Sequence, residues 1–368
     1  MRGGHPSAKY SERTAQPIRE ESVAKKRGRR RKEVKKGSTN TASKSRAADV
    51  RVSIADRAAR YRESLPDGMQ TSVWAEHADL LAMARAVTDS ITDCTHKFLA
   101  LERSEPRFSE SQPLRSQVYW IETLQYLHVG SAAGLMRHLR WVDGVLASMA
   151  CPQYLPFAAN VRGLLESAAD IDYVLKQIPG ILARNCAPIR EAVWGEATLH
   201  LSVHVVDNLA KLAKNHVERG IMEHIIHFTF AGRLGDRDEA PEYHSAQRTA
   251  KYLTALQGAD SGHIFDLYAD LCEITHPGKD SLAAFVSYAS DHLALRRNSE
   301  LGLISDLCEK HRAAMTTSIE VGINECLLCL KMLNRFPILE LHTTFLEGID
   351  LSYIPEWRKL EPLLNAAG

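Results

Sequence analysis

Apolar residues recur every three or four positions over most of the chain after residue 48, which is the spacing of amphipathic α-helices. Strand-like alternation is nearly absent and is confined to 227–230. The pattern predicts an all-α fold in the form of a multi-helix bundle. We expect a short helix and linker over 48–71, the bundle over 72–336 and a C-terminal helical tail over 337–368.

Capping residues, glycine and proline suggest where the helices begin and end. Ser72 is a candidate N-cap for a long helix through Leu101, and Gly130 separates two helices over 114–129 and 131–149. Further helices are expected over 160–175, 189–214, 243–256, 263–276, 282–295 and 299–334. At 1.5 Å per residue the last would be about 54 Å long, so we expect its end to pack on another subunit.

Positive charge is concentrated at the start of the chain. Residues 1–50 contain fifteen Lys or Arg and five Asp or Glu, a net charge of +10, whereas the other 318 residues carry −9. The first 47 residues have too few apolar side chains to build a core, so we predict a disordered basic arm over 1–47. The candidate nucleic-acid-binding residues are the basic run Lys25, Lys26, Arg27, Arg29, Arg30, Arg31 and Lys32.

Cationic arms bind phosphate backbones without sequence specificity and with strong salt dependence. The basic run has no aromatic residue beside it, so stacking on bases is not supported there. Docking on an acidic surface of the same or a neighbouring subunit, and a purely solubilising tail, are the alternatives. In a eukaryote the run would be typical of a nuclear localisation signal.

Several common classes of protein are disfavoured by the sequence. There is no apolar run near the ~18 residues that span a bilayer and no hydrophobic segment of a secretory signal at the N-terminus. Seven scattered cysteines favour a reducing cytoplasm, and we expect Cys326 and Cys329 to be buried thiols. No Gly-rich phosphate loop, GxSxG elbow, Walker motif or HExxH is present, which argues against the usual hydrolases and nucleotide-binding proteins.

Two of the predicted helices carry candidate catalytic residues. Arg162 and Glu166 are four residues apart on helix 160–175 and therefore face each other. The simple interpretation is a solvated ion pair worth ~0.5 kcal/mol or less. His276 ends helix 263–276 because Pro277 disfavours helical geometry there, so His276 is either a C-cap or a placed functional group.

The pairing of Arg162-x-x-x-Glu166 with Tyr268-x-x-Leu271-x4-His276-Pro277 resembles a set of uncharacterised all-helical bacterial proteins near the HEPN-like domains, over about residues 115–335. HEPN ribonucleases share an Arg-x4–6-His motif on one helix, used with a symmetry mate to cleave RNA. Arg219 and His224 have this spacing, although Gly220 replaces the polar residue usual after the arginine. The resemblance implies ribonuclease chemistry at Arg219 and His224, or at Arg162, Glu166 and His276.

A narrow polar stripe on helix 189–214 contains Glu196, His200 and His204, which together can bind a divalent metal. The alternative is a solvated stripe on an amphipathic helix, and we assign no cofactor from the sequence.

The leading hypothesis is a cytoplasmic helical protein that contacts nucleic acid through its arm. A defence or mobile-element setting is what the resemblance implies. The alternatives are a HEPN-like metal-independent ribonuclease and a helical metalloprotein. A homo-oligomer or a protein partner fits each hypothesis, and no membrane association is expected.

Overall fold

The computed structural model describes residues 53–91, 93–96, 112–194, 225, 249–257, 263–288, 292–295 and 297–366. The chain divides into two units, Met1–Asn40 and Thr41–Gly368, and every described residue belongs to the second. The predicted disordered arm therefore lies outside the described residues.

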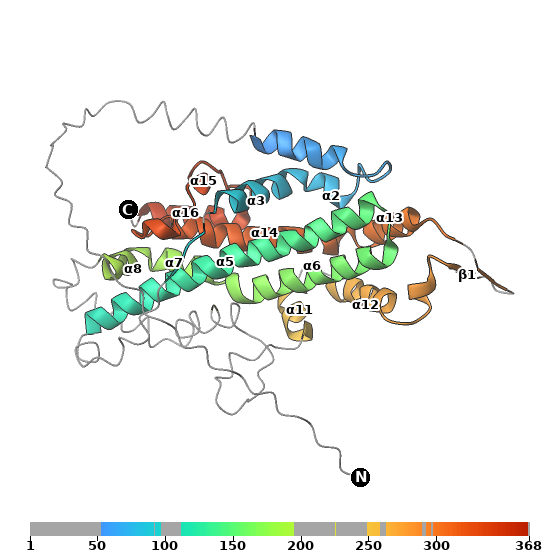
Figure 1. Cartoon of the computed structure of the whole chain (residues 1–368). Helices are drawn as coiled ribbons and strands as arrows, with labels where there is room; N and C mark the ends of the chain where they lie inside the picture. The colour runs from blue at the N-terminus through green and yellow to red at the C-terminus, as the bar shows by residue number, and fades with distance from the viewer. Residues whose placement is uncertain are drawn as a thin grey trace, which may run out of the picture. The chain divides into compact units, whose positions relative to one another are not determined.

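The described residues are almost entirely α-helical, which confirms the predicted all-α class. Three long helices form the centre of the bundle: α5 (Gln112–Ala150), α6 (Tyr154–Leu175) and α14 (Arg312–Leu333). Each packs against the other two, and the short turn between α5 and α6 makes these two helices antiparallel (Figure 1). Their apolar stripes meet in one core, because a helix of this kind is stabilised mainly by burying its apolar face.

Glycines allow the central helices to approach closely. A Cβ atom on Gly163 of α6 would lie 2.7 Å from the indole ring of Trp141 on α5. A Cβ atom on Gly322 of α14 would overlap the imidazole ring of His138, which is fully buried on α5. Any larger residue at these positions would push the helices apart or displace a buried ring.

Shorter elements surround the three central helices (Figure 1). α3 (Ala78–Ser90) packs on α5 and α14, while α11 (Thr249–Gln257) and α12 (Ile264–Thr275) cover α6. The remaining elements are a helix over 53–63, α2 (Val73–Glu76), α7 (Ile178–Arg184), α8 (Cys186–Val193), η4 (Asp280–Leu282), β1 (Val286–Tyr288), β2 (Leu293–Leu295), α13 (Glu300–Lys310), η5 (Leu339–Leu341), α15 (Thr344–Glu347) and α16 (Pro355–Ala366).

Two predictions in the first half of the bundle are wrong. Gly130 does not separate two helices, because α5 runs through it. A glycine inside a helix costs only about 1 kcal/mol, and the buried packing of α5 on two other helices outweighs that cost. The helix expected from Ser72 to Leu101 is interrupted at His77 and ends at Ser90. Ser72 makes no capping bond and instead donates its hydroxyl to the carbonyl of Met69.

Two further predictions fail in the second half. A hairpin of β1 and β2 replaces most of the helix expected over 282–295, pairing Val286 with Leu295. Leu293 and Leu295 are 71% and 91% exposed, so the apolar side chains of this segment do not join the core of the described residues. The helix expected over 299–334 is split at His311, whose buried ring turns toward Asp270 of α12. Its predicted length of about 54 Å therefore gives no reason to expect packing on another subunit.

Other predictions agree with the structure where it describes them. α12 begins and ends within one residue of the expected helix, and Cys326 and Cys329 are fully buried thiols on α14. By contrast, the helix expected over 189–214 is wrong at its start, because α8 begins at Cys186 and ends at Val193 with Trp194 as its C-cap; residues 195–214 lie outside the described part of the chain. Among the described helices, α14 is long and apolar enough to cross a membrane by length and composition, but 67% of its most apolar window is buried within the protein. A core helix has the same properties.

Candidate functional site

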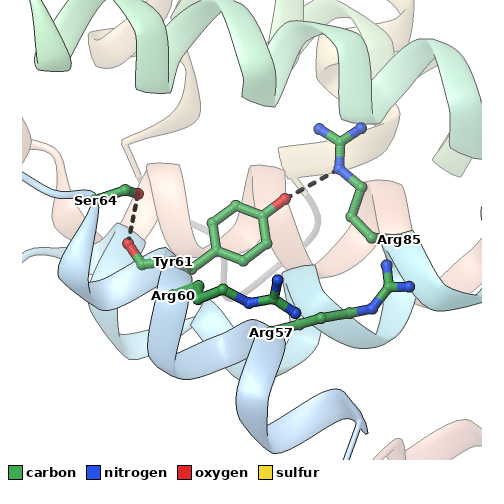
Figure 2. A pocket seen from close by; sticks show the side chains of 5 residues that line it. All are labelled: Arg57, Arg60, Tyr61, Ser64 and Arg85. Atoms are coloured by element: carbon green, nitrogen blue, oxygen red, sulfur yellow. Dashed lines mark hydrogen bonds between the residues drawn. The ribbon is translucent and has the colours of Figure 1, made fainter.

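A surface pocket of about 490 Å³ is lined by five residues, three of them arginines. Arg57, Arg60, Tyr61 and Ser64 come from the helix over 53–63 and the residue after it, and Arg85 comes from α3. We call this site the arginine pocket (Figure 2). The spacing of the first four residues is i, i+3, i+4 and i+7, which places them on one face of their helix.

Small side chains bring the two helices of the pocket together. Ala58 of the first helix is fully buried against Ala78 and Ala82 of α3. This seam of alanines allows the helices to pack closely, and Arg57 and Tyr61 flank it. The arginine pocket is therefore formed by helix packing and not by a loop.

Arg85 is held in place by several partners. Its Nε donates to the hydroxyl of Tyr61 at 3.0 Å, and Figure 2 shows the phenol pointing toward this guanidinium. Its Nη2 donates to the carbonyl oxygen of Leu139 on α5 at 3.2 Å and forms an ion pair with Asp143. An arginine fixed through its guanidinium loses little further side-chain entropy when it binds an anion.

The other two arginines are freer. Arg57 pairs through Nη1 with Asp89 at 2.6 Å, and both side chains are partly exposed. Arg60 donates through Nε to the main-chain oxygen of Asp56, and no carboxylate among the described residues forms an ion pair with it. With Asp89 and Asp143 balancing two of the three arginines, the pocket carries an excess positive charge.

These groups suit a phosphate or a similar oxyanion. Guanidinium groups present planar donors that match phosphate oxygens, and a serine hydroxyl can donate as well. Ser64 donates its hydroxyl to the main-chain oxygen of Tyr61 at 2.8 Å, so it would have to turn to reach a ligand. None of the five lining residues is acidic, which fits an anion better than a cation.

The structure brings together most of the residues predicted on helices 160–175 and 263–276. Arg162 of α6 donates to Glu166 at 3.1 Å and reaches across to α12, where it bonds the hydroxyls of Tyr268 at 3.3 Å and Thr275 at 3.4 Å. Burial raises the pKa of the Tyr268 phenol although Arg162 opposes the rise, so the phenol stays protonated at neutral pH. Arg162 thus joins two helices and is more than the exposed i,i+4 pair of the simple interpretation.

His276 follows Thr275 directly and is exposed at the C-terminal end of α12. Its main-chain N–H donates to the carbonyl of Cys272, which closes the helix. His276 is therefore the C-cap residue that the sequence offered as one of two interpretations, and the residue is exposed.

Other candidate residues lie outside the described part of the chain. They are the basic run Lys25, Lys26, Arg27, Arg29, Arg30, Arg31 and Lys32, the pair Arg219 and His224, and the stripe Glu196, His200 and His204.

Sequence patterns pointed neither to the arginine pocket nor to a cluster of Cys94, His96 and His128. The ligand atoms of the second group all lie within 4.8 Å of one another. One signal was available, the Cys94-x-His96 spacing. The third member comes from a helix that begins beyond an intervening segment, so only the tertiary structure reveals it.

Comparisons of the chain with protein-family models, with curated proteins and with solved structures gave no match.

Proposed function

We propose that the protein binds nucleic acid and that the arginine pocket holds a backbone phosphate. The observation that carries this proposal is that Arg57, Arg60 and Arg85 line one cavity, whose lining contains no acidic residue. About half or more of protein–DNA hydrogen bonds go to phosphate and sugar, chiefly from side chains of this kind.

The basic arm supports the same function from the sequence. Its run from Lys25 to Lys32 contains seven cations in eight residues and suits non-specific contact with a phosphate backbone. In this proposal the arm supplies general electrostatic attraction, and the arginine pocket supplies a contact on a rigid part of the fold. A defence or mobile-element setting remains part of the proposal through the resemblance to HEPN-like proteins.

A salt-titrated binding assay tests the proposal. Fluorescence anisotropy of the full chain is measured on labelled duplex DNA and on single-stranded RNA at several salt concentrations. Each lost phosphate contact should lower the slope of log K against log salt by about 0.9 on duplex DNA and by about 0.7 on a single strand. Arg57→Ala combined with Arg60→Ala removes the contact with the one bound phosphate and should therefore lower the slope on duplex DNA by about 0.9.

The matched control is Arg358→Ala, which removes an exposed arginine on α16. A full-length variant with Gln at all seven positions of the basic run measures the contribution of the arm separately. If the double variant binds with the affinity and slope of the wild type while the Gln variant loses binding, the arginine pocket takes no part. If the wild type binds neither nucleic acid, the proposed function is wrong.

The second candidate function is a metal-independent ribonuclease using Arg162, Glu166 and His276. It is favoured by the reach of Arg162 from α6 to Thr275, the neighbour of His276. The same RNA samples are analysed on a denaturing gel in the presence of a chelator. Cleavage that is lost in both Arg162→Ala and His276→Ala would support this function, and intact RNA with the wild type would remove it.

A further inference from the structure

Outside the arginine pocket, three side chains meet where the segment after α3 lies on α5. Cys94 and His96 belong to residues 93–96, and His128 extends from α5. The side chain of His128 is buried, that of His96 is half-buried, and Cys94 is exposed. The two imidazole rings are nearly perpendicular, with an interplanar angle of 80°.

Their polar atoms are spaced like ligands around one metal ion. His96 Nε2 lies 3.1 Å from His128 Nδ1, and Cys94 Sγ lies 3.5 Å from the first and 3.8 Å from the second. Zinc bonds of about 2.3 Å to sulfur and about 2.05 Å to nitrogen at tetrahedral angles place S and N about 3.6 Å apart and two N atoms about 3.3 Å apart. Each of the three observed distances between ligand atoms differs from the tetrahedral value by no more than about 0.3 Å.

The surroundings also suit a metal. His128 is buried among core residues of α5, and an imidazole ring offers a nitrogen lone pair to a metal. Glu340 of η5 is near enough to act electrostatically on His96, which adds negative charge beside the cluster. A thiol and two neutral imidazoles are the ligand types that zinc prefers.

We propose that Cys94, His96 and His128 bind one Zn²⁺ ion. On binding, the Cys94 thiol loses its proton to solvent and its sulfur forms the bond to zinc, while both imidazoles bind as neutral ligands through His96 Nε2 and His128 Nδ1. Three protein ligands leave a fourth tetrahedral position for water or another ligand. The ion ties residues 93–96 to α5.

The alternative is a cluster joined only by hydrogen bonds, in which one imidazole donates to the other. Cobalt distinguishes the two arrangements because Co²⁺ replaces Zn²⁺ and reports a thiolate ligand by a sulfur-to-metal charge-transfer band. Full-length protein stripped of metal by a chelator is titrated with Co²⁺, and the band should saturate at one ion per chain. Competition with Zn²⁺ in the same cuvette gives the zinc affinity.

Cys94→Ser should abolish the charge-transfer band and weaken zinc binding by at least about 100-fold, since loss of an outer-shell partner alone costs about 10–100-fold. His96→Gln should weaken zinc binding similarly, and it avoids disturbing the buried His128. Cys151→Ser, which replaces another exposed thiol, should leave both the band and the affinity unchanged.

Three results would overturn the proposal. The first is no band with the wild type, and the second is a band that survives Cys94→Ser. The third is a loss of zinc binding when His200 and His204 are both changed to Ala while Cys94→Ser has no effect. That pattern would place the metal on the polar stripe predicted from the sequence.

Discussion

Glu325 on α14 is a buried carboxylic acid that forms no ion pair within the part of the chain that the structure describes. Its side chain is 8% exposed, and its Oε2 has no hydrogen-bond partner within the described structure. Burial raises the pKa of Glu325 to about 8, and the nearby carboxylates of Asp172 and Glu356 add to the rise while Lys176 opposes it. We therefore expect Glu325 to be protonated in the folded protein at neutral pH.

The stability consequence follows from the difference between folded and unfolded pKa values. The unfolded chain ionises near 4.5 and the folded one near 8, so the folded state binds an extra proton between these values and stability falls as pH rises. The free energy of unfolding is lowered by about 1 kcal/mol at pH 5, about 3 kcal/mol at pH 7 and about 4 kcal/mol at pH 8. These values are upper bounds, because water and side chains relax around an ionised buried group.

Glu325→Gln keeps the shape of the protonated acid and cannot ionise. The free energy of unfolding of wild type and variant is measured with urea at pH 5 to 8. The variant should be the more stable protein, and the difference between the two should widen by up to about 3 kcal/mol as pH rises. Other groups that titrate in this range cancel in the difference between the two proteins. Glu361→Gln, which changes an exposed carboxylate on α16, is the matched control and should give a nearly flat difference.

A gap that stays constant between pH 5 and 8 would refute the reasoning. It would mean that Glu325 ionises as easily in the folded as in the unfolded chain, and hence that solvent or Lys176 reaches it.

Two other predictions concern the contact between α5 and α14. Gly322→Ala should destabilise the protein by about 1–3 kcal/mol or more, because the added methyl overlaps the buried ring of His138. Gly302→Ala is the control, because a Cβ atom there would lie 3.4 Å from the nearest side-chain atoms, an ordinary contact; it should be neutral or slightly stabilising. Urea unfolding that shows the same loss of stability in both variants would contradict the packing argument. Burial lowers the pKa of His138 to about 3, with a smaller effect from Arg137, so the unfolded state binds more protons below about pH 6.5 and stability falls with acid. Between pH 6.5 and 5, the free energy of unfolding should fall by about 2 kcal/mol less in His138→Gln than in the wild type. An equal fall in both proteins would show that His138 can be protonated in the fold.

The sequence was sufficient for features that depend on neighbours along the chain. The apolar spacing within 263–276 and the stop at His276 and Pro277 predicted α12 to within one residue. Cys326 and Cys329 lie on the apolar stripe of their helix and are buried as expected. These predictions succeed because helical periodicity and termination are set by residues three to four positions apart.

Features that depend on packing between distant segments were not predictable in this way. Gly130 marked a helix end by its local preference, yet burial against two other helices carries α5 through it. Residues 282–295 were expected to form a helix, yet Leu293 and Leu295 are exposed on β2, which pairs with β1. The helix propensity of one residue other than proline contributes at most about 1 kcal/mol. Burial of apolar surface between helices contributes more and can outweigh it.

The candidate sites also combine features that neighbours along the chain determine with contacts that depend on packing. The sequence by itself determined a helical bundle, a basic arm and helices on which Arg162 and His276 stand at defined positions. Only the tertiary structure placed Arg85 of α3 beside Arg57 and Arg60, and His128 of α5 beside Cys94 and His96. The physical reason is that the pattern along a helix specifies which face is buried, whereas the side chains that meet across helices depend on which helices pack together and at what register.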